Sequence, residues 1–233
     1  MTTAPLLRGI SSMATRQVLA ELTAAYAASS PGVGPVQIES VGGVDAAKRV
    51  AAGEVFDVVI LAADAIDKLL TAGHLLPGSK VDWVHSGVAV AVPAGAPLPD
   101  IRTEEAVRQA VLAAPSISLS TGPSGVALAK LFERWGIAEQ IAPRMVQAPP
   151  GVPVGSLVAK GEVALGFQQL SELLHVPGIQ IVGPLPAAIQ ITTTFSAGVG
   201  THSQQVDAAR ALLAYLASPA AADAKRKQGM EPA

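Results

Sequence analysis

The sequence contains no cysteine and has few aromatic or charged residues. Cysteine is absent from all 233 positions, aromatic residues make up 3% of them and charged residues 15%. Without cysteine the chain has no disulfide, no thiolate nucleophile and no thiolate metal site. With so few aromatic residues the core must be built from Ala, Val, Leu and Ile, a composition that favours layers of helices over a sheet rich in Val and Ile.

An excess of charge and long apolar runs are also missing. The formal net charge is −2 and no run of Lys or Arg is present, so the chain offers no electrostatic footprint for nucleic acid or an acidic membrane. No apolar run is long enough to span a membrane, and residues 1–17 lack the apolar stretch of a signal peptide. We therefore expect no nucleic-acid partner, no membrane span and, for the sequence as written, a cytoplasmic protein. A chain from which a leader had been removed would instead be periplasmic.

Familiar catalytic and metal-binding motifs are absent as well. The histidines lack ligand spacing, and the sequence has neither a phosphate-binding P-loop nor a G-x-S-x-G elbow. The four histidines are His74, His85, His175 and His202. We therefore predict no metal and no cofactor, covalent hydrolysis is disfavoured, and no catalytic residue is assigned.

Strand-like apolar runs alternate with helical patterns along the chain. "VQIES" precedes "VDAAKRVAAGE", and "FDVVILA" precedes "ADAIDKLLTAG", where Gly73 predicts a helix end. After the loop "HLLPGSKVDWV" the order recurs, with "SISLS" before "PSGVALAKLFERWG" and "VALGF" before "QQLSELLH". This alternation predicts an α/β fold with a largely parallel sheet.

Two extended segments, near residues 82–92 and 180–199, enclose a self-contained α/β pattern of about a hundred residues. Two such crossings predict a hinge between two lobes, with a single doubly wound domain as the alternative. The predicted bounds are 1–83 with 190–233 for lobe 1, 86–188 for lobe 2, and 84–85 and 189 for the hinge segments.

Four strand-to-helix junctions carry small residues: "ISSMATRQ", "ILAADAI", "SLSTGPSGVA" and "APPGVPVGSLV". Ligands of open α/β sheets bind outside the carboxyl ends of the strands, and helix starts present N–H groups and positive dipole ends. We therefore expect an anion site there, with hydroxyl donors and with Gly122 and Gly125 allowing close approach. A plainer interpretation stays open, in which Ser12 and Ser124 cap helices and Asp64 stabilises its own helix start.

The order of several segments resembles a known family over nearly the whole chain. These segments are "GEVFDVVILAADAIDKLLTAGHLLPGSKVD", "GVAVAVPAGAPLPDI", "SISLSTGPSGVALAKLFERWGI", "VAKGEVALGFQQLSELL", "IQIVGPLP", "FSAGV" and "ARALLAYLASPAAADAKRKQGMEPA". They are similar to the molybdate-binding-protein-like branch of the type II periplasmic solute-binding proteins. The resemblance implies two α/β lobes joined by two crossing segments, a ligand clamped between them by a hinge motion, and an ABC permease as partner if the protein is exported. The positions that it implies at the ligand are Ser11, Ser12, Ala62, Ala63, Thr121, Ser124, Gly125, Val126, Pro153 and Val154.

One departure from this branch concerns the ligand. Molybdate binders of the branch usually have Tyr just after the strand that here reads "LGFQQ", whereas this chain has Gln168 and Gln169. Amide side chains both donate and accept hydrogen bonds, which suits an organic carboxylate. Arg16 could bind a carboxylate through two hydrogen bonds, although a solvated helix-face arginine is the alternative.

Three functions follow from these patterns. We expect a protein that binds a small anion, an organic di- or tricarboxylate, by a clamshell motion. The segments "GFQQLSELL" and "GISSMATRQ" also resemble a sub-branch that includes aconitate isomerases, which implies an enzyme that shifts an allylic proton in a polycarboxylate. Such an enzyme needs a base, for which Asp64 or a hydroxyl is the candidate. The third possibility is a molybdate- or tungstate-binding protein of an ABC importer.

Overall fold

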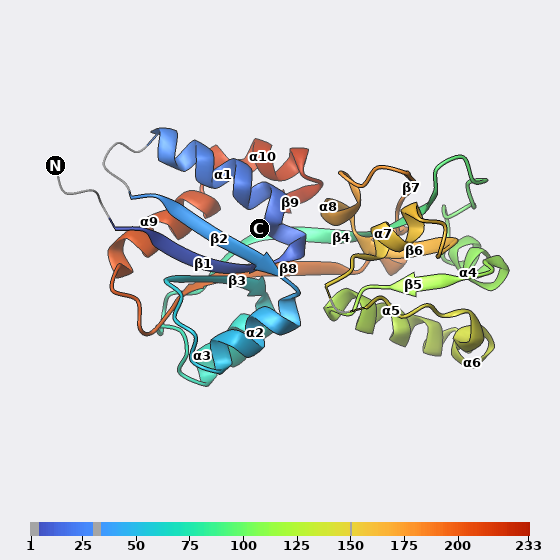
Figure 1. The fold of residues 1–233 in the computed structure, drawn as a ribbon. Helices are drawn as coiled ribbons and strands as arrows, with labels where there is room; N and C mark the ends of the chain where they lie inside the picture. Colours follow the sequence, from blue (N-terminus) through green and yellow to red (C-terminus); the bar gives the residue numbers. More distant parts are fainter. Residues whose placement is uncertain (1–4, 30–33, 150) are drawn as a thin grey trace. The chain divides into compact units, whose positions relative to one another are not determined.

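The chain folds as two compact α/β units. The computed structural model describes residues 5–29, 34–149 and 151–233 (Figure 1). Unit 1 consists of Met1–His85 and Thr194–Ala233, and unit 2 of Ser86–Thr193. The chain passes between them within strand β4 (Val81–Pro93) and near the start of β8 (Thr192–Val199). The second passage lies after the position expected near 189, because Ile189 still belongs to the core of unit 2.

Unit 1 is built on a sheet with the strand order β2-β1-β3-β8. Strand β1 is parallel to both β2 and β3, and β8 is antiparallel to β3. The further strands are β1 (Leu7–Ser12), β2 (Val36–Val41), β3 (Val58–Ala62) and the short β9 (Met230–Pro232). The helices are η1 (Met13–Thr15), α1 (Arg16–Ser29), α2 (Gly43–Ala51), α3 (Ala63–Thr71), α9 (Val206–Ala217), η4 (Pro219–Ala221) and α10 (Ala222–Lys227).

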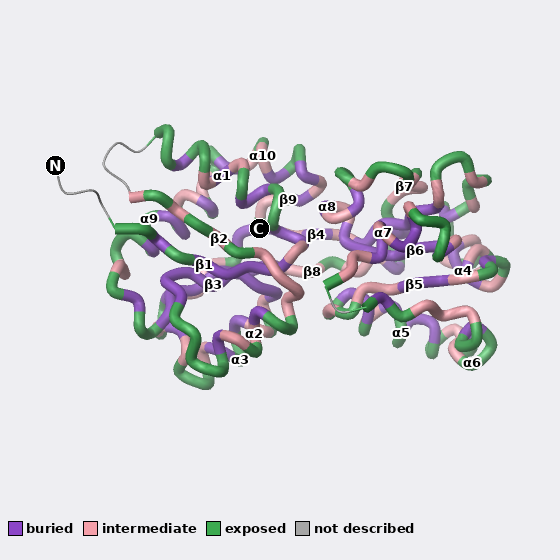
Figure 2. The backbone as a smooth tube through the Cα atoms, in the orientation of Figure 1, coloured by how far each residue is buried: buried purple, intermediate pink, exposed green. Residues whose placement is uncertain are grey.

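Strand β3 lies at the centre of unit 1 and is buried along its whole length (Figure 2). Because side chains alternate along a strand, Val58 and Ile60 join one core with α1 and α9. Val59 and Leu61 join a second core with α2 and α3 on the other face. The expectation of helix layers without a Val- and Ile-rich sheet is therefore wrong, since β3 uses these residues in a strand that is covered on both faces.

Unit 2 places its helices around a second group of strands. Here β4 is antiparallel to β6 and β7, and β5 is parallel to β6. The strands are β5 (Ile117–Leu119), β6 (Leu165–Gln169) and β7 (Ile179–Pro184). The helices are α4 (Glu104–Ala113), α5 (Pro123–Arg134), α6 (Ala138–Ile141), η2 (Ala142–Arg144), α7 (Val154–Ala159), α8 (Leu170–Leu173) and η3 (Ala187–Ile189).

The α/β alternation predicted from the sequence is confirmed, with three local corrections. Strand β4 begins at Val81, inside the predicted loop, because Trp83 is 1% exposed and its carbonyl accepts hydrogen bonds from Lys225 Nζ and the Ala233 N–H. Strand β6 runs to Gln169, so the helix expected from residue 168 begins two residues later. Strand β9 was not predicted. No helix in the described part of the chain is long and apolar enough to cross a membrane.

Candidate functional site

Three helix starts gather at one edge of the sheet in unit 1. The parallel strands β1, β2 and β3 all end there, with Ser12 beside Val41 in the register of β1 and β2. Helices η1, α2 and α3 begin directly after these strands. None of the three N-cap residues, Ser12, Gly42 and Ala62, accepts a side-chain capping hydrogen bond. Positive dipole ends therefore meet at this edge without a capping hydrogen bond from the N-cap side chains, and Asp45 and Asp64 lie in the first turns of α2 and α3.

Ser12 carries a buried hydroxyl that lacks a partner. Its side chain is 7% exposed, and Oγ forms no hydrogen bond with any described residue. Although Ser12 occupies the N-cap position of η1, it makes no capping hydrogen bond, so the interpretation of Ser12 as a capping side chain is wrong. Ser11 differs, because its Oγ lies 2.7 Å from Ser40 Oγ inside the protein. Of the two serines, Ser12 has a hydroxyl that is available to a ligand.

The other predicted positions of unit 1 lie at the same edge. Ala62 ends β3 and Ala63 begins α3, so they offer backbone groups there. Arg16 begins α1, is exposed, and forms no ion pair with a described residue. Asp64 lies on the surface of α3 with its side chain 60% exposed and its carboxylate 3.7 Å from Lys68 Nζ. The plainer interpretation of Asp64 therefore fits its position.

A comparable edge in unit 2 follows the parallel strands β5 and β6, where Leu119 lies beside Phe167. Helix α5 begins at Pro123 with Gly122 as N-cap, so the interpretation of Ser124 as the N-cap is wrong. Proline fits the first position of a helix because the N–H that it lacks would have no intrahelical partner there. Ser124 Oγ lies 2.9 Å from Ser120 Oγ, and a pair of hydroxyls that shares one hydrogen bond keeps a second hydrogen to donate.

Gly125 has a packing role in this loop. A Cβ atom added to Gly125 would lie 1.7 Å from the Ser120 carbonyl oxygen, so the loop contacts the helix backbone directly. Thr121 and Val126 are exposed on either side of this contact. The glycine thus holds the hydroxyl-bearing loop against α5.

The start of α7 is held by Gln168. Pro153 is the N-cap without a side-chain capping bond, and the side chain of Val154 is buried in a local core. The Gly155 N–H donates to Gln168 Oε1 at 2.9 Å, and Gln168 Nε2 donates to Glu172 Oε2 at 2.8 Å. Both ends of the Gln168 amide are therefore bonded inside unit 2.

The neighbouring Gln169 is also bonded internally and is 4% exposed. The orientation that satisfies both ends of its amide has the nitrogen donating to Ser86 Oγ at 2.7 Å and the oxygen accepting from Thr193 Oγ1 at 2.9 Å. Ser86 and Thr193 are the residues of unit 2 at the two chain passages. The sequence placed both glutamines after a strand, whereas in the structure they lie within β6 and face internal partners.

Glu172 was not predicted from the sequence. Its side chain lies on α8 and is partly exposed. Burial raises the pKa of Glu172 to about 7, although the hydrogen bond from Gln168 acts in the opposite direction. The available sequence signal was that Gln168 and Glu172 lie four residues apart in a segment predicted to be a helix. In the structure Gln168 belongs to β6 instead. A carboxyl group with a pKa near neutrality can accept and return a proton under ordinary conditions.

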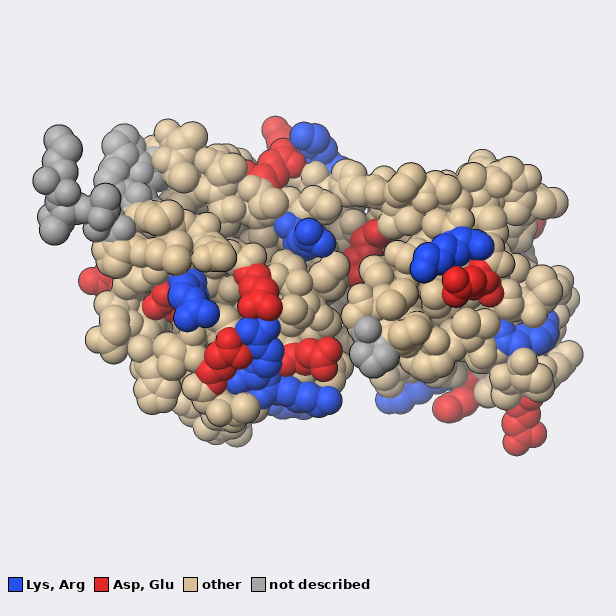
Figure 3. All heavy atoms as spheres, viewed as in Figure 1, with Lys and Arg blue, Asp and Glu red and all other residues tan. Residues whose placement is uncertain are grey.

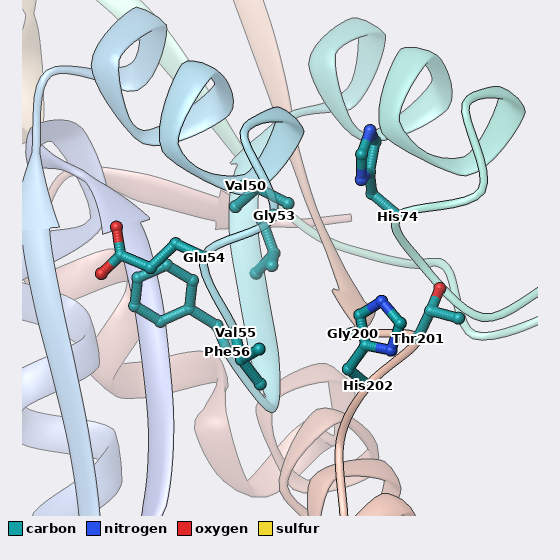
Figure 4. A pocket seen from close by; sticks show the side chains of 10 residues that line it. Val50, Gly53, Glu54, Val55, Phe56, His74, Gly200, Thr201 and His202 are labelled. Carbon is teal, nitrogen blue, oxygen red and sulfur yellow. The ribbon is translucent and has the colours of Figure 1, made fainter.

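A pocket in unit 1 lies away from these edges, near the amino end of β3 (Figure 4). It is a small hollow between the ends of α2, α3 and β8. It is lined by Val50, Gly53, Glu54, Val55, Phe56, Val59, His74, Gly200, Thr201 and His202. None of the predicted ligand positions lines it. Among the described residues, no group of three or more His, Asp or Glu side chains could hold a metal ion.

Charged side chains of both signs are interspersed on the face seen in Figure 3. On unit 1, Arg49 forms ion pairs with Glu39 at 2.7 Å and Glu54 at 2.6 Å. Hydrogen bonds from Arg49 lower the pKa of both carboxyl groups. The donors at the two edges are instead hydroxyl and backbone amide groups, with Arg16 as the one basic side chain among the predicted positions. An anion would there meet dipoles in place of a basic patch.

Comparisons with known proteins agree with this fold. A model of the bacterial extracellular solute-binding protein family matches residues 7–231. An aconitate isomerase from a Pseudomonas species is 44% identical over 185 residues, covering 79% of this chain and 70% of the relative.

Two solved structures share the fold over nearly their whole length. The periplasmic molybdate-binding protein of Azotobacter vinelandii has a TM-score of 0.79 at 20% identity and covers 96% of this chain and 98% of its own. A tungstate-binding protein from Desulfovibrio alaskensis has a TM-score of 0.70 at 16% identity and covers 99% of both chains. These structures confirm the predicted two-lobed type II fold. The chain belongs to the bacterial extracellular solute-binding protein family.

Proposed function

We propose that this protein binds a small organic di- or tricarboxylate through groups at the carboxyl edge of unit 1. One observation carries the proposal: the buried Ser12 Oγ has no partner among the described residues, at an edge where three helices begin without a capping bond from the N-cap side chain. A buried donor without an acceptor is unfavourable, and a bound anion would supply that acceptor. Within unit 2, the Ser120 and Ser124 hydroxyl pair offers donors of the same kind at the carboxyl edge of that unit.

We propose a carboxylate and not a metal oxyanion because of the similarity to an aconitate isomerase. Gln168 and Gln169 do not support this choice. Because the Gln168 and Gln169 amides are bonded inside unit 2, they do not themselves favour a carboxylate. The support is the 44% identical aconitate isomerase, since aconitate is a tricarboxylate. A clamshell closure about the ligand, and docking to an ABC permease if the protein is exported, stay predictions.

Calorimetric titration with trans-aconitate tests the binding proposal, with the Ser12→Ala variant as the matched comparison. We expect saturable binding at one site in the original protein and a weaker affinity in the variant. Saturable binding of molybdate together with no heat from trans-aconitate, citrate or succinate would overturn the carboxylate assignment.

A second candidate function is isomerisation of aconitate, which the 44% identity specifically favours. The reaction removes a proton from the CH2 carbon next to the double bond and returns it to the former alkene carbon, so that the double bond moves by one position. Donors at helix starts would stabilise the negative charge that develops on the substrate carboxylate. Proton NMR of trans-aconitate with the protein tests this: appearance of cis-aconitate supports it, and an unchanged spectrum at high protein concentration contradicts it.

A further inference from the structure

The hydrogen bonds around Gln168 determine which oxygen of Glu172 carries a proton. The Gly155 N–H can only donate, so it fixes the acceptor end of the Gln168 amide at 2.9 Å. The Nε2 end must then face Glu172 Oε2, to which it donates at 2.8 Å. Because Oε2 accepts this bond in both protonation states, a proton on Glu172 must sit on the other oxygen, Oε1.

Glu172 Oε1 has no partner among the described residues, and the Glu172 side chain is partly exposed. Oε1 is not among the buried polar side-chain atoms that lack a partner, which in the described ranges are Ser12 Oγ, Trp83 Nε1 and Ser118 Oγ. One carboxylate oxygen is thus held in place while the other can exchange protons. The pair stands at the end of β6, beside the start of α7.

The titratable side chains on the adjoining segments are Lys160 and Glu162 after α7 and His175 after α8. None of them contributes to the raised pKa of Glu172, whose causes are burial and the Gln168 hydrogen bond. Asp64, the base suggested by the sequence, is instead exposed and lies near Lys68. Glu172 is therefore better suited than Asp64 to remove a proton from carbon near pH 7.

We propose that Glu172 is the catalytic general base of this protein, acting through Oε1, and that it also returns the proton. The inference rests on the isomerase function proposed above. In the first step Oε1 takes the proton from the substrate CH2 carbon, and the electron pair of the broken C–H bond delocalises over the allylic system into the adjacent carboxylate. In the second step the same oxygen returns the proton to the former alkene carbon. No oxidant, reductant or other reactant is consumed.

The test compares Glu172→Gln with Glu162→Gln, a matched control that changes an exposed carboxylate in the same unit. Glutamine keeps an oxygen that accepts from Gln168 Nε2 but cannot take the proton. We expect kcat for trans-aconitate isomerisation and deuterium uptake from D2O to fall about 10²- to 10⁴-fold in Glu172→Gln, with the Kd for trans-aconitate changed by less than about threefold. Glu162→Gln should match the original protein. Below pH 7 the kcat/KM of the original protein should fall as Glu172 becomes protonated, and the variant should lose this dependence.

The outcomes separate the two proposals. If the original protein isomerises trans-aconitate and Glu172→Gln keeps its kcat, or loses Kd instead of kcat, the role of Glu172 is wrong while the isomerase function stands. If the original protein binds trans-aconitate but neither isomerises it nor exchanges its protons, the isomerase function and the catalytic role of Glu172 are both overturned. Absence of binding would in addition overturn the carboxylate assignment.

Discussion

Replacing Ser12 by alanine should weaken ligand binding without destabilising the protein. In the structure Ser12 Oγ is buried, has no partner among the described residues and caps no helix. An unsatisfied buried polar group costs about 1–3 kcal/mol, and alanine removes that group without leaving an unpaired neighbour. The ligand-free Ser12→Ala variant should therefore be as stable as the original protein or more stable, with Tm raised by about 2–4 °C per kcal/mol gained.

The effect on binding should have the opposite direction. If Ser12 Oγ donates to an anion, its removal costs the complex about 1.5–3 kcal/mol, which corresponds to an affinity about 10- to 150-fold weaker. Calorimetric titration with trans-aconitate gives the affinity, and differential scanning calorimetry without ligand gives Tm. The two measurements together separate a ligand-binding hydroxyl from a structural one.

Thr103 provides the matched control, because it is a working cap. Its Oγ1 accepts from the Ala106 N–H at 3.1 Å at the start of α4. Thr103→Ala should lose about 1 kcal/mol of stability and leave the affinity unchanged. If Ser12→Ala instead has lower stability and unchanged affinity, as expected for Thr103→Ala, then the Ser12 hydroxyl supports the fold and does not bind the ligand.

Three further substitutions test other parts of the structure. Gly125→Ala should destabilise the protein by at least about 1–3 kcal/mol in urea unfolding, because its Cβ would lie 1.7 Å from the Ser120 carbonyl oxygen; stability equal to the original would contradict this contact. Asp57→Ala should cost about 2–4 kcal/mol in the same assay, since it leaves the part-buried Arg8 N–H and the buried Ser203 Oγ without their acceptor. A loss below about 0.5 kcal/mol would be inconsistent with that network. The pKa of Glu172 is raised from its ordinary value of 4.5 to about 7, so the folded protein binds a proton at Glu172 more tightly than the unfolded chain does. The free energy of unfolding that this proton contributes is lost as pH rises from 4.5 to about 7. The free energy of unfolding of Glu172→Gln, relative to the original protein, should therefore rise between about pH 5 and pH 8. The rise should reach up to roughly 3 kcal/mol, since one pKa unit corresponds to about 1.4 kcal/mol. If this difference does not change with pH, the pKa of Glu172 is not raised.

Local patterns predicted the elements well where neighbouring residues decide the structure. Gly73 was expected to end a helix, and it follows α3 with a φ of 79°, a conformation that glycine adopts without strain. The helix beginning at Pro123 and the strand "VVILA" were likewise readable from the sequence. The start of β4 was not, because Trp83 is held in place by Lys225 and Ala233, which lie more than a hundred residues away.

The candidate site shows the same division between local and distant causes. Three of the four predicted strand-to-helix junctions follow strands, namely those after β1, β3 and β5. A helix also begins at the fourth, but α7 follows η2 and a loop, so the strand expected before it is wrong. The partners of individual side chains were not readable from the sequence: Ser12 lacks a capping bond, while Gln168 is bound by Gly155 and Glu172. Glu172 was missed because burial, a product of tertiary packing, is the main cause of its raised pKa.

A thermal-shift panel of anions tests whether this protein binds tricarboxylates in preference to metal oxyanions. A ligand that binds only the folded state raises the apparent stability by mass action, so the shift in Tm ranks the ligands by affinity. The panel would contain trans-aconitate, cis-aconitate, citrate and succinate beside molybdate, tungstate and sulfate, each at the same concentration and ionic strength. We predict that the tricarboxylates, led by trans-aconitate, raise Tm the most. Clear stabilisation by molybdate or tungstate, with none from any carboxylate, would show that the ligand is a metal oxyanion and would overturn the carboxylate assignment.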